Sequence, residues 1–259
     1  MRESGILMHI TSLPAPYGIG TMGKDAYAFV DFLVRAGQRY WQILPLTPTG
    51  YGDSPYQSLG ACAGNHYLID LDRLADEGLL KKEEIQNIPW GSNSARVDFG
   101  AMYAHRMNVL RQAFQRFTPD GAYETFVEQN RSWLEDYALF TALKDTLGGK
   151  PWLEWPEALR LRKADALAEK RRELSDEIRL QYFVQYEFDR QWKALRSYAN
   201  AKGVRIIGDV PIYVPLDSAD VWANPELFQL DESRHPEQVA GCPPDSFTAD
   251  GQLWGNPIY

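Results

Sequence analysis

The sequence predicts an α/β fold in which short parallel strands alternate with helices. Three apolar runs, at residues 5–10, 40–45 and 204–210, are typical of strands that are buried on both faces. Between the first two runs, residues 24–36 repeat apolar side chains at helical spacing. A strand, a helix and a strand within about forty residues form a βαβ unit, and the two strands of such a unit run parallel.

The first βαβ unit is marked by residues that begin and end its elements. After the strand at residues 5–10, glycine and proline punctuate a loop that runs to Gly20. The helix at residues 24–36 is followed by Gly37, a residue typical of the position just after a helix. The apolar stripe of this helix consists of Ala26, Phe29, Val30 and Leu33.

The remainder of the chain is divided by composition. A short strand is expected at residues 66–70, and a helix-rich region follows from about residue 101 to residue 200. Its last helix, residues 175–200, carries an apolar stripe and leads into the third strand. The tail, residues 211–259, reads as a long loop over an active face without a further strand.

This organisation predicts three parts. Residues 1–70 hold the first βα units and a substrate loop, and residues 71–200 form a mainly helical insertion. Residues 201–259 hold the third barrel strand and a covering loop. About 160 residues separate the second and third strands, far more than one crossover connection requires.

Charge and composition exclude several classes of function. The chain has 259 residues and a net charge of −8, without the basic stripe that nucleic-acid binding needs. The basic segment at residues 163–172 is mixed with acidic residues and reads as a solvated helix face. No metal-ligand spacing, cofactor motif or membrane-spanning run is present, so we expect no metal, no cofactor and no membrane partner. A cytoplasmic location is expected.

The chemistry is expected at the carboxyl ends of the parallel strands. His9 opens the loop after the first strand, and Asp209 ends the third. Asp209 has two interpretations: an active-site carboxylate that holds an arginine or a sugar hydroxyl, or a structural aspartate that caps the next turn.

Two polar loops are further candidates for a ligand site. Residues 50–58 combine tyrosine, aspartate, serine and glutamine, a mixture that can stack on a sugar ring and bond its hydroxyl groups. The alternative interpretation of residues 50–58 is a turn without a ligand role, because the sequence Gly-Asp-Ser-Pro strongly favours a turn. Residues 243–246 and 251–256 form the second loop, in which Trp254 is flanked by polar residues and glycine.

Taken together, these segments resemble the amylomaltase family of 4-α-glucanotransferases, also called disproportionating enzymes. The resemblance covers essentially the whole chain, with its motifs in family order. The residues that carry it are 5–7, 11–14, 17–20, 52–58, 63–65, 68–71, 208–214, 243–245 and 251–257.

The resemblance implies a (β/α)8 TIM barrel of the α-amylase type, of which only the first strands are present, with a large helical insertion. It implies transfer of α-1,4-glucan segments between maltooligosaccharides or starch, or to glucose, by a retaining double displacement. Asp209 would be a supporting carboxylate. The implied substrate contacts are Tyr56, Ser54, Gln57, Asp245, Trp254 and Asn256. Tyr51 and Tyr103 resemble a secondary glucan site.

In this family the nucleophile and the acid/base carboxylate lie on later strands than those found here. We therefore expect a chain that is truncated before the remaining barrel and inactive alone. An unclosed parallel sheet also leaves an edge open, so self-association is expected. A non-catalytic glucan-binding protein on the same scaffold is the alternative. A third interpretation is a hydrolase of the wider amylase group. It is disfavoured because residues 208–214 lack the histidine found there in typical amylases.

Overall fold

The computed structural model describes residues 2–50, 52–93 and 95–259. Its contacts group the chain into two units, each built from separate stretches of sequence. Unit 1 comprises residues 1–48, 64–129 and 182–210, and unit 2 comprises residues 49–63, 130–181 and 211–259. The predicted division into three consecutive parts stays a prediction.

Unit 1 contains the predicted parallel sheet. Strands β1 (Gly5–Leu7), β2 (Tyr40–Gln42) and β3 (Arg205–Ile207) lie in the order β1-β2-β3, and both pairs are parallel. Helix α1 (Lys24–Arg35) connects the first two strands, and Gly37 follows it with a φ of 69°. The βαβ unit and the helix boundaries predicted from the sequence are therefore confirmed.

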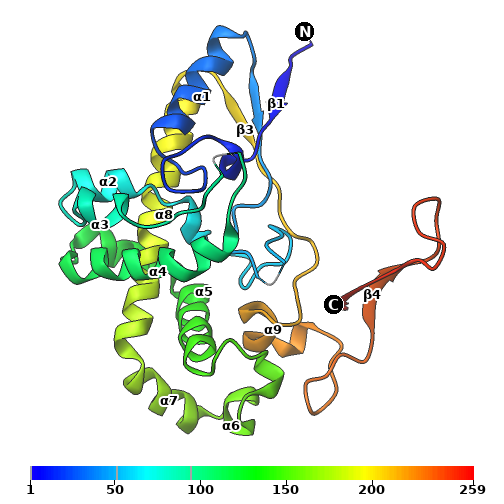
Figure 1. Ribbon diagram of the computed structural model, residues 1–259. Coiled ribbons are helices and arrows are strands. Elements are labelled where there is room, and N and C mark those ends of the chain that lie inside the picture. The colour runs from blue at the N-terminus through cyan, green and yellow to red at the C-terminus, as the bar shows by residue number, and fades with distance from the viewer. Residues whose placement is uncertain (1, 51, 94) are drawn as a thin grey trace. The chain divides into compact units, whose positions relative to one another are not determined.

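Two helices cover one side of the sheet, α1 and the C-terminal part of α8 (Ser175–Ala201) (Figure 1). The ring centroids of Phe29 on α1 and Trp41 on β2 lie 5.1 Å apart. The Tyr198 hydroxyl of α8 donates a 2.7 Å hydrogen bond to Asp31 of α1. The covered face holds Trp41, which is fully buried.

The opposite face of the sheet is exposed, which corrects the prediction of strands buried on both faces. The register aligns Leu7, Gln42 and Ile207, and the exposed fractions of Leu7 and Ile207 are 55% and 43%. Apolar runs of this kind predict a strand, but they do not report how many faces of the sheet are covered.

The rest of unit 1 is helical. It holds the 3₁₀ helices η1 (Ile10–Ser12) and η2 (His66–Leu68) and the helices α2 (Leu71–Asp76), α3 (Lys82–Gln86) and α4 (Phe99–Arg116). Helix α5 (Gly121–Thr146), like α8, has residues in both units.

The strand expected at residues 66–70 is wrong, because η2 lies there. Side chains take the backbone bonds that a neighbouring strand would need. The Asn65 side chain accepts from the Tyr67 amide at 2.9 Å, and Arg106 donates to the Tyr67 carbonyl oxygen at 2.8 Å. Gln191 accepts from the Asp70 amide at 2.7 Å.

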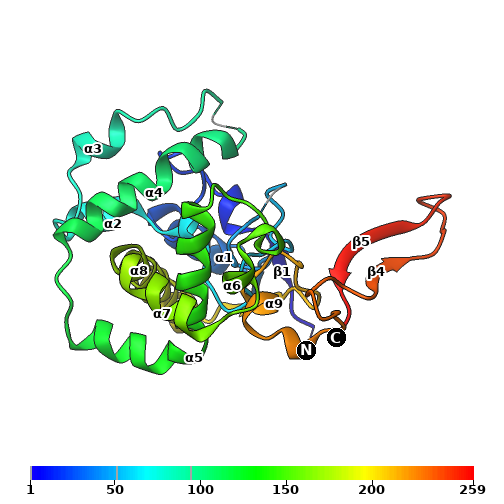
Figure 2. The same ribbon diagram turned by 90° about the horizontal axis from the view of Figure 1, so that it is seen from below.

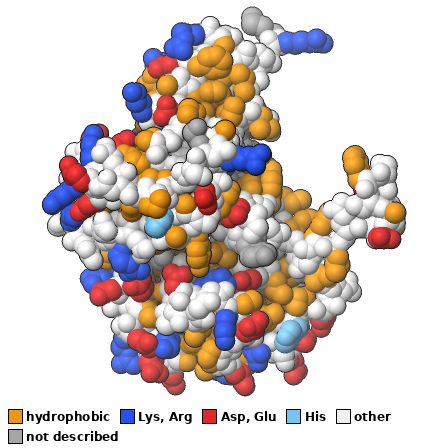
Figure 3. All heavy atoms as spheres, in the orientation of Figure 1, with side chains coloured by type: hydrophobic (Ala, Val, Ile, Leu, Met, Phe, Trp, Pro, Cys, Tyr) orange, Lys and Arg blue, Asp and Glu red, His pale blue; other side chains and the backbone are white. Residues whose placement is uncertain are grey.

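Unit 2 packs short helices around a cluster of aromatic side chains. Its own elements are η3 (Trp152–Glu154), α6 (Glu157–Arg160), α7 (Ala164–Glu173), α9 (Ala219–Ala223) and η4 (Pro225–Leu227). The ring centroids of Trp155 and Trp222 lie 5.6 Å apart, and the Arg162 guanidinium lies 4.2 Å from the Trp222 ring centroid. Acidic and basic side chains mix over α6 and α7 (Figure 3), as expected of a solvated helix face.

The tail of unit 2 contains a β-hairpin, which corrects the prediction of a loop without strands. Strands β4 (Val239–Cys242) and β5 (Gln252–Pro257) pair antiparallel and run side by side in Figure 2. A register irregularity lies between Val239 and Gly241. Glycine and proline residues within the two strands weaken the sequence pattern that predicts strands, so the hairpin was not predicted.

Candidate functional site

The carboxyl ends of the three parallel strands form the first part of the candidate site, in unit 1. Two further backbone bonds extend the sheet: the Met8 amide donates to the Gln42 carbonyl, and the Ile43 amide to the Ile207 carbonyl, each at 3.0 Å. His9 is the residue after Met8, and Asp209 lies two residues after Ile207. Neighbouring strands are about 4.8 Å apart, so the first and third strands lie about 10 Å apart at this edge.

His9 supplies a neutral imidazole to this edge. Its ring is largely buried, and burial lowers the pKa of His9 from 6.5 to about 4. Its Nδ1 atom is buried and has no hydrogen-bond partner among the described residues. At neutral pH this side chain can therefore exchange hydrogen bonds with a hydroxyl group without carrying a charge.

Asp209 is exposed at the same edge. Its Oδ1 accepts a 2.8 Å hydrogen bond from the Val210 amide, as the turn-capping interpretation predicts. Because the carboxylate is exposed, the cost of burying a bare charge does not arise. Its exposure also leaves it accessible to a ligand, so the geometry is compatible with both interpretations.

The predicted ligand loop, residues 50–58, lies within the stretch 49–63 of unit 2 and closes on itself. Thr49 and Ser58 form an antiparallel bridge, and the Gly50 amide donates to the Gln57 carbonyl at 2.7 Å. The Ser54 hydroxyl accepts from the Tyr56 amide at 3.3 Å. Tyr56 is 42% exposed at the tip of this turn. The turn chemistry thus presents an aromatic ring to solvent; the predicted Tyr51 lies outside the described residues.

Helix α9 holds this loop in place. Asp220 Oδ2 accepts from the Ala61 amide at 2.9 Å, and the Ala219 amide donates to the Leu59 carbonyl at 2.9 Å. Burial raises the pKa of Asp220, and its bond to Ala61 opposes that rise. The sequence analysis missed this anchor. Its available signal was Ser218, whose hydroxyl caps the helix by accepting from the Val221 amide at 3.3 Å.

The β4–β5 hairpin and the loop that precedes α9 meet through aromatic side chains. The ring centroids of Trp254 and Tyr213 lie 6.1 Å apart, and the two side chains are 45% and 37% exposed. The Trp254 indole N–H donates to the Gln252 side chain at 3.0 Å. Two partly exposed rings held side by side form a surface that suits the apolar face of a sugar.

Asn256 fixes the hairpin to the same loop. Asn256 is only 5% exposed, and its Nδ2 atom donates a hydrogen bond to the Val214 carbonyl at 3.0 Å. The Tyr259 hydroxyl donates to the Ile212 carbonyl at 2.8 Å. The structure therefore gives Asn256 a backbone partner within the protein, and the predicted contact with sugar stays a prediction.

Asp245 holds the turn between β4 and β5. Its Oδ1 accepts from the Phe247 amide at 2.8 Å and the Thr248 amide at 2.9 Å. These two bonds lower the pKa of Asp245, with the bond to Thr248 the larger cause. The side chain is exposed, so its predicted substrate contact also stays a prediction.

Tyr103, the other residue of the predicted secondary site, is 83% exposed on α4 of unit 1. The candidate residues thus fall into two groups: Asp209 and Tyr103 belong to unit 1, and Tyr56, Trp254, Asp245 and Asn256 to unit 2. In the described part of the chain, no group of three histidine, cysteine or acidic side chains could hold a metal ion. None of the described helices has the length and apolar character needed to cross a membrane.

Comparison with known proteins identifies the family. The family described as 4-alpha-glucanotransferase matches residues 8–259. The chain belongs to the 4-alpha-glucanotransferase family. It is 52% identical to the 4-alpha-glucanotransferase of Thermus thermophilus and 50% identical to that of Streptococcus pneumoniae, in each case over 100% of this chain and 52% of the relative. The chain therefore spans about half the length of these curated relatives.

Solved structures agree with this family assignment. The amylomaltase of Streptococcus agalactiae in complex with acarbose matches with a TM-score of 0.97 and 49% identity, over 100% of this chain and 53% of the other. The Corynebacterium glutamicum amylomaltase matches with a TM-score of 0.73 over 99% of this chain and 36% of the other, at 19% identity, which speaks to the fold alone.

Proposed function

We propose that this chain forms the N-terminal part of the glucan cleft of a 4-α-glucanotransferase. That enzyme transfers α-1,4-glucan segments between maltooligosaccharides or starch, or to glucose, in the cytoplasm. The observation that carries the proposal is the family match over residues 8–259, together with about 50% identity to relatives named for this activity. The acarbose bound to the Streptococcus agalactiae amylomaltase supports an oligosaccharide ligand.

In this proposal the three parallel strands are the first strands of a (β/α)8 barrel. The sheet face covered by α1 and α8 would be the outside of the barrel, where helices belong. The exposed face that carries Leu7, Gln42 and Ile207 would be the inside. The edge that carries His9 and Asp209 would then be the catalytic rim, because barrel enzymes place their sites at the carboxyl ends of the strands.

In this proposal each exposed side chain makes a different contact with the glucan. Tyr56 stacks on a sugar ring, and Ser54 and Gln57 supply polar contacts beside it. Asp209 accepts a hydrogen bond from a sugar hydroxyl or an arginine at the catalytic rim. Trp254, beside Tyr213 on unit 2, offers a second aromatic surface for a sugar ring.

The chemical step of such a transfer needs a nucleophilic carboxylate and an acid/base carboxylate close together. The family resemblance places both on later strands than β3. We therefore propose that this chain binds glucan without turning it over. Asp245 and Asn256, which bond to the backbone, hold the β4–β5 hairpin in place, and their predicted contacts with sugar would add to that role. Tyr103, with Tyr51, belongs to a secondary glucan site.

The test is binding of acarbose to this chain by isothermal titration calorimetry, with glucose release from maltotriose measured in parallel. Tyr56→Ala should weaken binding about tenfold, because a stacked aromatic ring contributes about 1.5 kcal/mol. Tyr56→Phe should bind nearly as well as the unchanged chain. Phe32→Ala, which removes an aromatic ring of similar exposure (44%) from α1, is the matched control.

Three results would contradict the proposal. The first is an absence of acarbose binding by the unchanged chain, and the second is equal binding by Tyr56→Ala. Glucose release above background would instead show that the chain carries catalytic carboxylates of its own. Binding without release is the expected outcome.

A further inference from the structure

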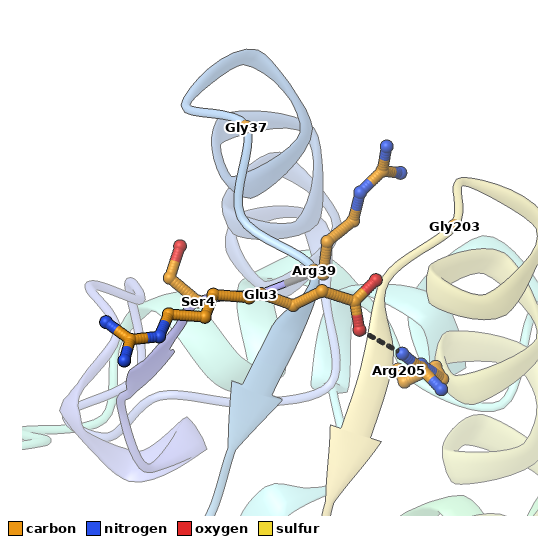
Figure 4. A pocket seen from close by; sticks show the side chains of 7 residues that line it. Glu3, Ser4, Gly37, Arg39, Gly203 and Arg205 are labelled. Atoms are coloured by element: carbon orange, nitrogen blue, oxygen red, sulfur yellow. Dashed lines mark hydrogen bonds and ion pairs between the residues drawn. The ribbon is translucent and has the colours of Figure 1, made fainter.

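A second pocket lies at the opposite ends of the same three strands. It has a volume of about 520 Å³ and is drawn in Figure 4. Its lining comes from the residues that precede or open the strands: Arg2, Glu3, Ser4, Gly37, Arg39, Gly203 and Arg205. Asp209 follows the carboxyl end of β3, so the pocket is separate from the candidate glucan rim.

The backbone around this pocket is fixed by the parallel sheet. The Arg39 amide donates to the Ser4 carbonyl at 2.8 Å, and the Arg205 amide donates to the Arg39 carbonyl at 2.9 Å. These bonds continue the ladder that pairs Gly5, Tyr40 and Arg205. Three arginine-bearing segments are thereby held side by side on a rigid element.

The charges of the pocket do not balance. Its lining contains three arginines and one carboxylate, Glu3, in a chain whose net charge is −8. Glu3 is already engaged: it pairs with Arg205 at 2.5 Å and accepts from the Tyr40 hydroxyl at 2.9 Å. The Arg205 guanidinium also lies 4.5 Å from the Tyr40 ring centroid. One arginine is therefore neutralised, and a charge of +2 remains on Arg2 and Arg39.

Arg39 is the central unpaired cation. Arg39 is exposed, and its guanidinium makes no ion pair or side-chain hydrogen bond with another described residue. In Figure 4 it extends away from the Glu3–Arg205 pair. A side chain at Gly203 would begin 3.3 Å from Arg39 Nη1, so the glycine leaves room beside the guanidinium. An arginine could instead bond the carbonyls that end α1 or α8, but no such bond from Arg39 is found among the described residues.

Guanidinium groups match phosphate better than any neutral sugar. Their planar N–H donors bind phosphate oxygens in pairs, and such bonds between charged groups are the strongest hydrogen bonds in proteins. A neutral glucan would gain no charge-assisted bond from Arg2 and Arg39, whereas an anion would. The volume lies within the usual range of small-molecule sites, about 300 to 1,000 Å³.

We propose that this pocket binds a small phosphorylated ligand through Arg39, Arg2 and the Glu3-supported Arg205. The proposal does not depend on the glucan-transfer function, because it concerns the other ends of the strands. It predicts an anion site that is physically separate from sugar binding.

The test uses inorganic pyrophosphate as the probe, titrated into this chain by calorimetry at constant ionic strength. We expect saturable binding, with Arg39→Gln weakening it at least about tenfold, the typical effect of losing a charge-assisted bond. Arg172→Gln, an exposed arginine of α7 that removes the same charge, is the matched control and should change the affinity less than about twofold. Circular dichroism melting of each variant checks that it folds.

The proposal is overturned if pyrophosphate does not bind, or if Arg39→Gln and Arg172→Gln weaken binding equally. Equal heats from sodium chloride at matched ionic strength would also overturn it, since general screening would then account for the signal. Loss of pyrophosphate binding in Arg39→Gln with acarbose binding unchanged is the expected pattern. If Arg39→Gln fails to fold, Arg2→Gln at the exposed start of the chain provides the same comparison.

Discussion

Two partly buried histidines of unit 1, His9 and His66, should make folding stability fall in mild acid. Burial, reinforced by the nearby Arg106, lowers the pKa of His66 from 6.5 to about 3. Burial lowers the pKa of His9 to about 4. Between pH 6.5 and 4 the unfolded chain therefore takes up protons at these two sites and the folded chain does not. The stabilisation that the two neutral histidines provide is complete above pH 6.5 and is lost progressively as the pH falls below that value.

The magnitude follows from the two pKa values. At pH 5.0 each histidine should cost about 1 to 2 kcal/mol relative to pH 7.5. Glu84 contributes little in this window, because its pKa is lowered from 4.5 to about 2, chiefly by Arg116, so its stabilising effect is lost only below about pH 4.5. Burial raises the pKa of Glu187 and of Asp220, so these two carboxyl groups take up protons in the folded chain as the pH falls and oppose the loss. Both groups are retained in the histidine variants, so their effect cancels in the comparison.

The assay is urea unfolding followed by tryptophan fluorescence at pH 7.5 and 5.0. His66→Gln should reduce the difference in unfolding free energy between the two pH values by about 1 to 2 kcal/mol. Because the readout is a difference, any destabilisation that the substitution causes at both pH values cancels. His235→Gln, at a side chain 55% exposed, is the control and should leave the difference unchanged. The reasoning is refuted if His66→Gln retains the full difference.

Three further predictions concern the loops of unit 2. Asp220→Ala should lower the melting temperature by about 2–6 °C, because the Ala61 amide loses its acceptor, whereas Asp220→Asn keeps an acceptor and should stay close to the unchanged chain. Asn256→Ala should lower the melting temperature by a similar amount, since the Val214 carbonyl loses its donor. The same substitution should also weaken acarbose binding measured by calorimetry. The Cys62 side chain is exposed, but partial desolvation of its sulfur and the charge of Asp220 raise the pKa of the thiol. Mass spectrometry should therefore find this thiol alkylated by iodoacetamide at pH 7.5 more slowly in the folded than in the unfolded chain.

Elements whose partners are close in sequence could be predicted. The stripe at residues 24–36 and the glycine after it defined α1 to within one residue, because a helix bonds mainly within itself. The apolar runs around β1, β2 and β3 located the parallel sheet, although each strand is shorter than its run. The turn at residues 50–58 could be predicted because its turn chemistry is contained within the segment that the Thr49–Ser58 bridge closes. Its contact with substrate stays a prediction.

Elements whose bonds come from distant residues could not be predicted. Residues 66–70 look like a strand, yet Arg106 and Gln191 take their backbone groups, and neither is near them in sequence. The backbone partner of Asn256 is another example. The Val214 carbonyl lies 42 residues earlier, and the local pattern carries no sign of it. The sugar contact that the family resemblance implies for Asn256 stays a prediction.

The candidate site therefore depends on two kinds of residue that experiments can separate. Asp220 and Asn256 bond to backbone groups, so they anchor loops, whereas the exposed ring of Trp254 bonds to the Gln252 side chain through its indole N–H. Substituting an anchor should lower stability and ligand affinity together, because the loop loses its position. Trp254→Ala should lower affinity with a smaller loss of stability, since the indole N–H donates to a side chain and not to a backbone group. If Trp254→Ala and Asn256→Ala produced the same loss of stability for the same loss of acarbose binding, this separation of anchor and contact would be wrong.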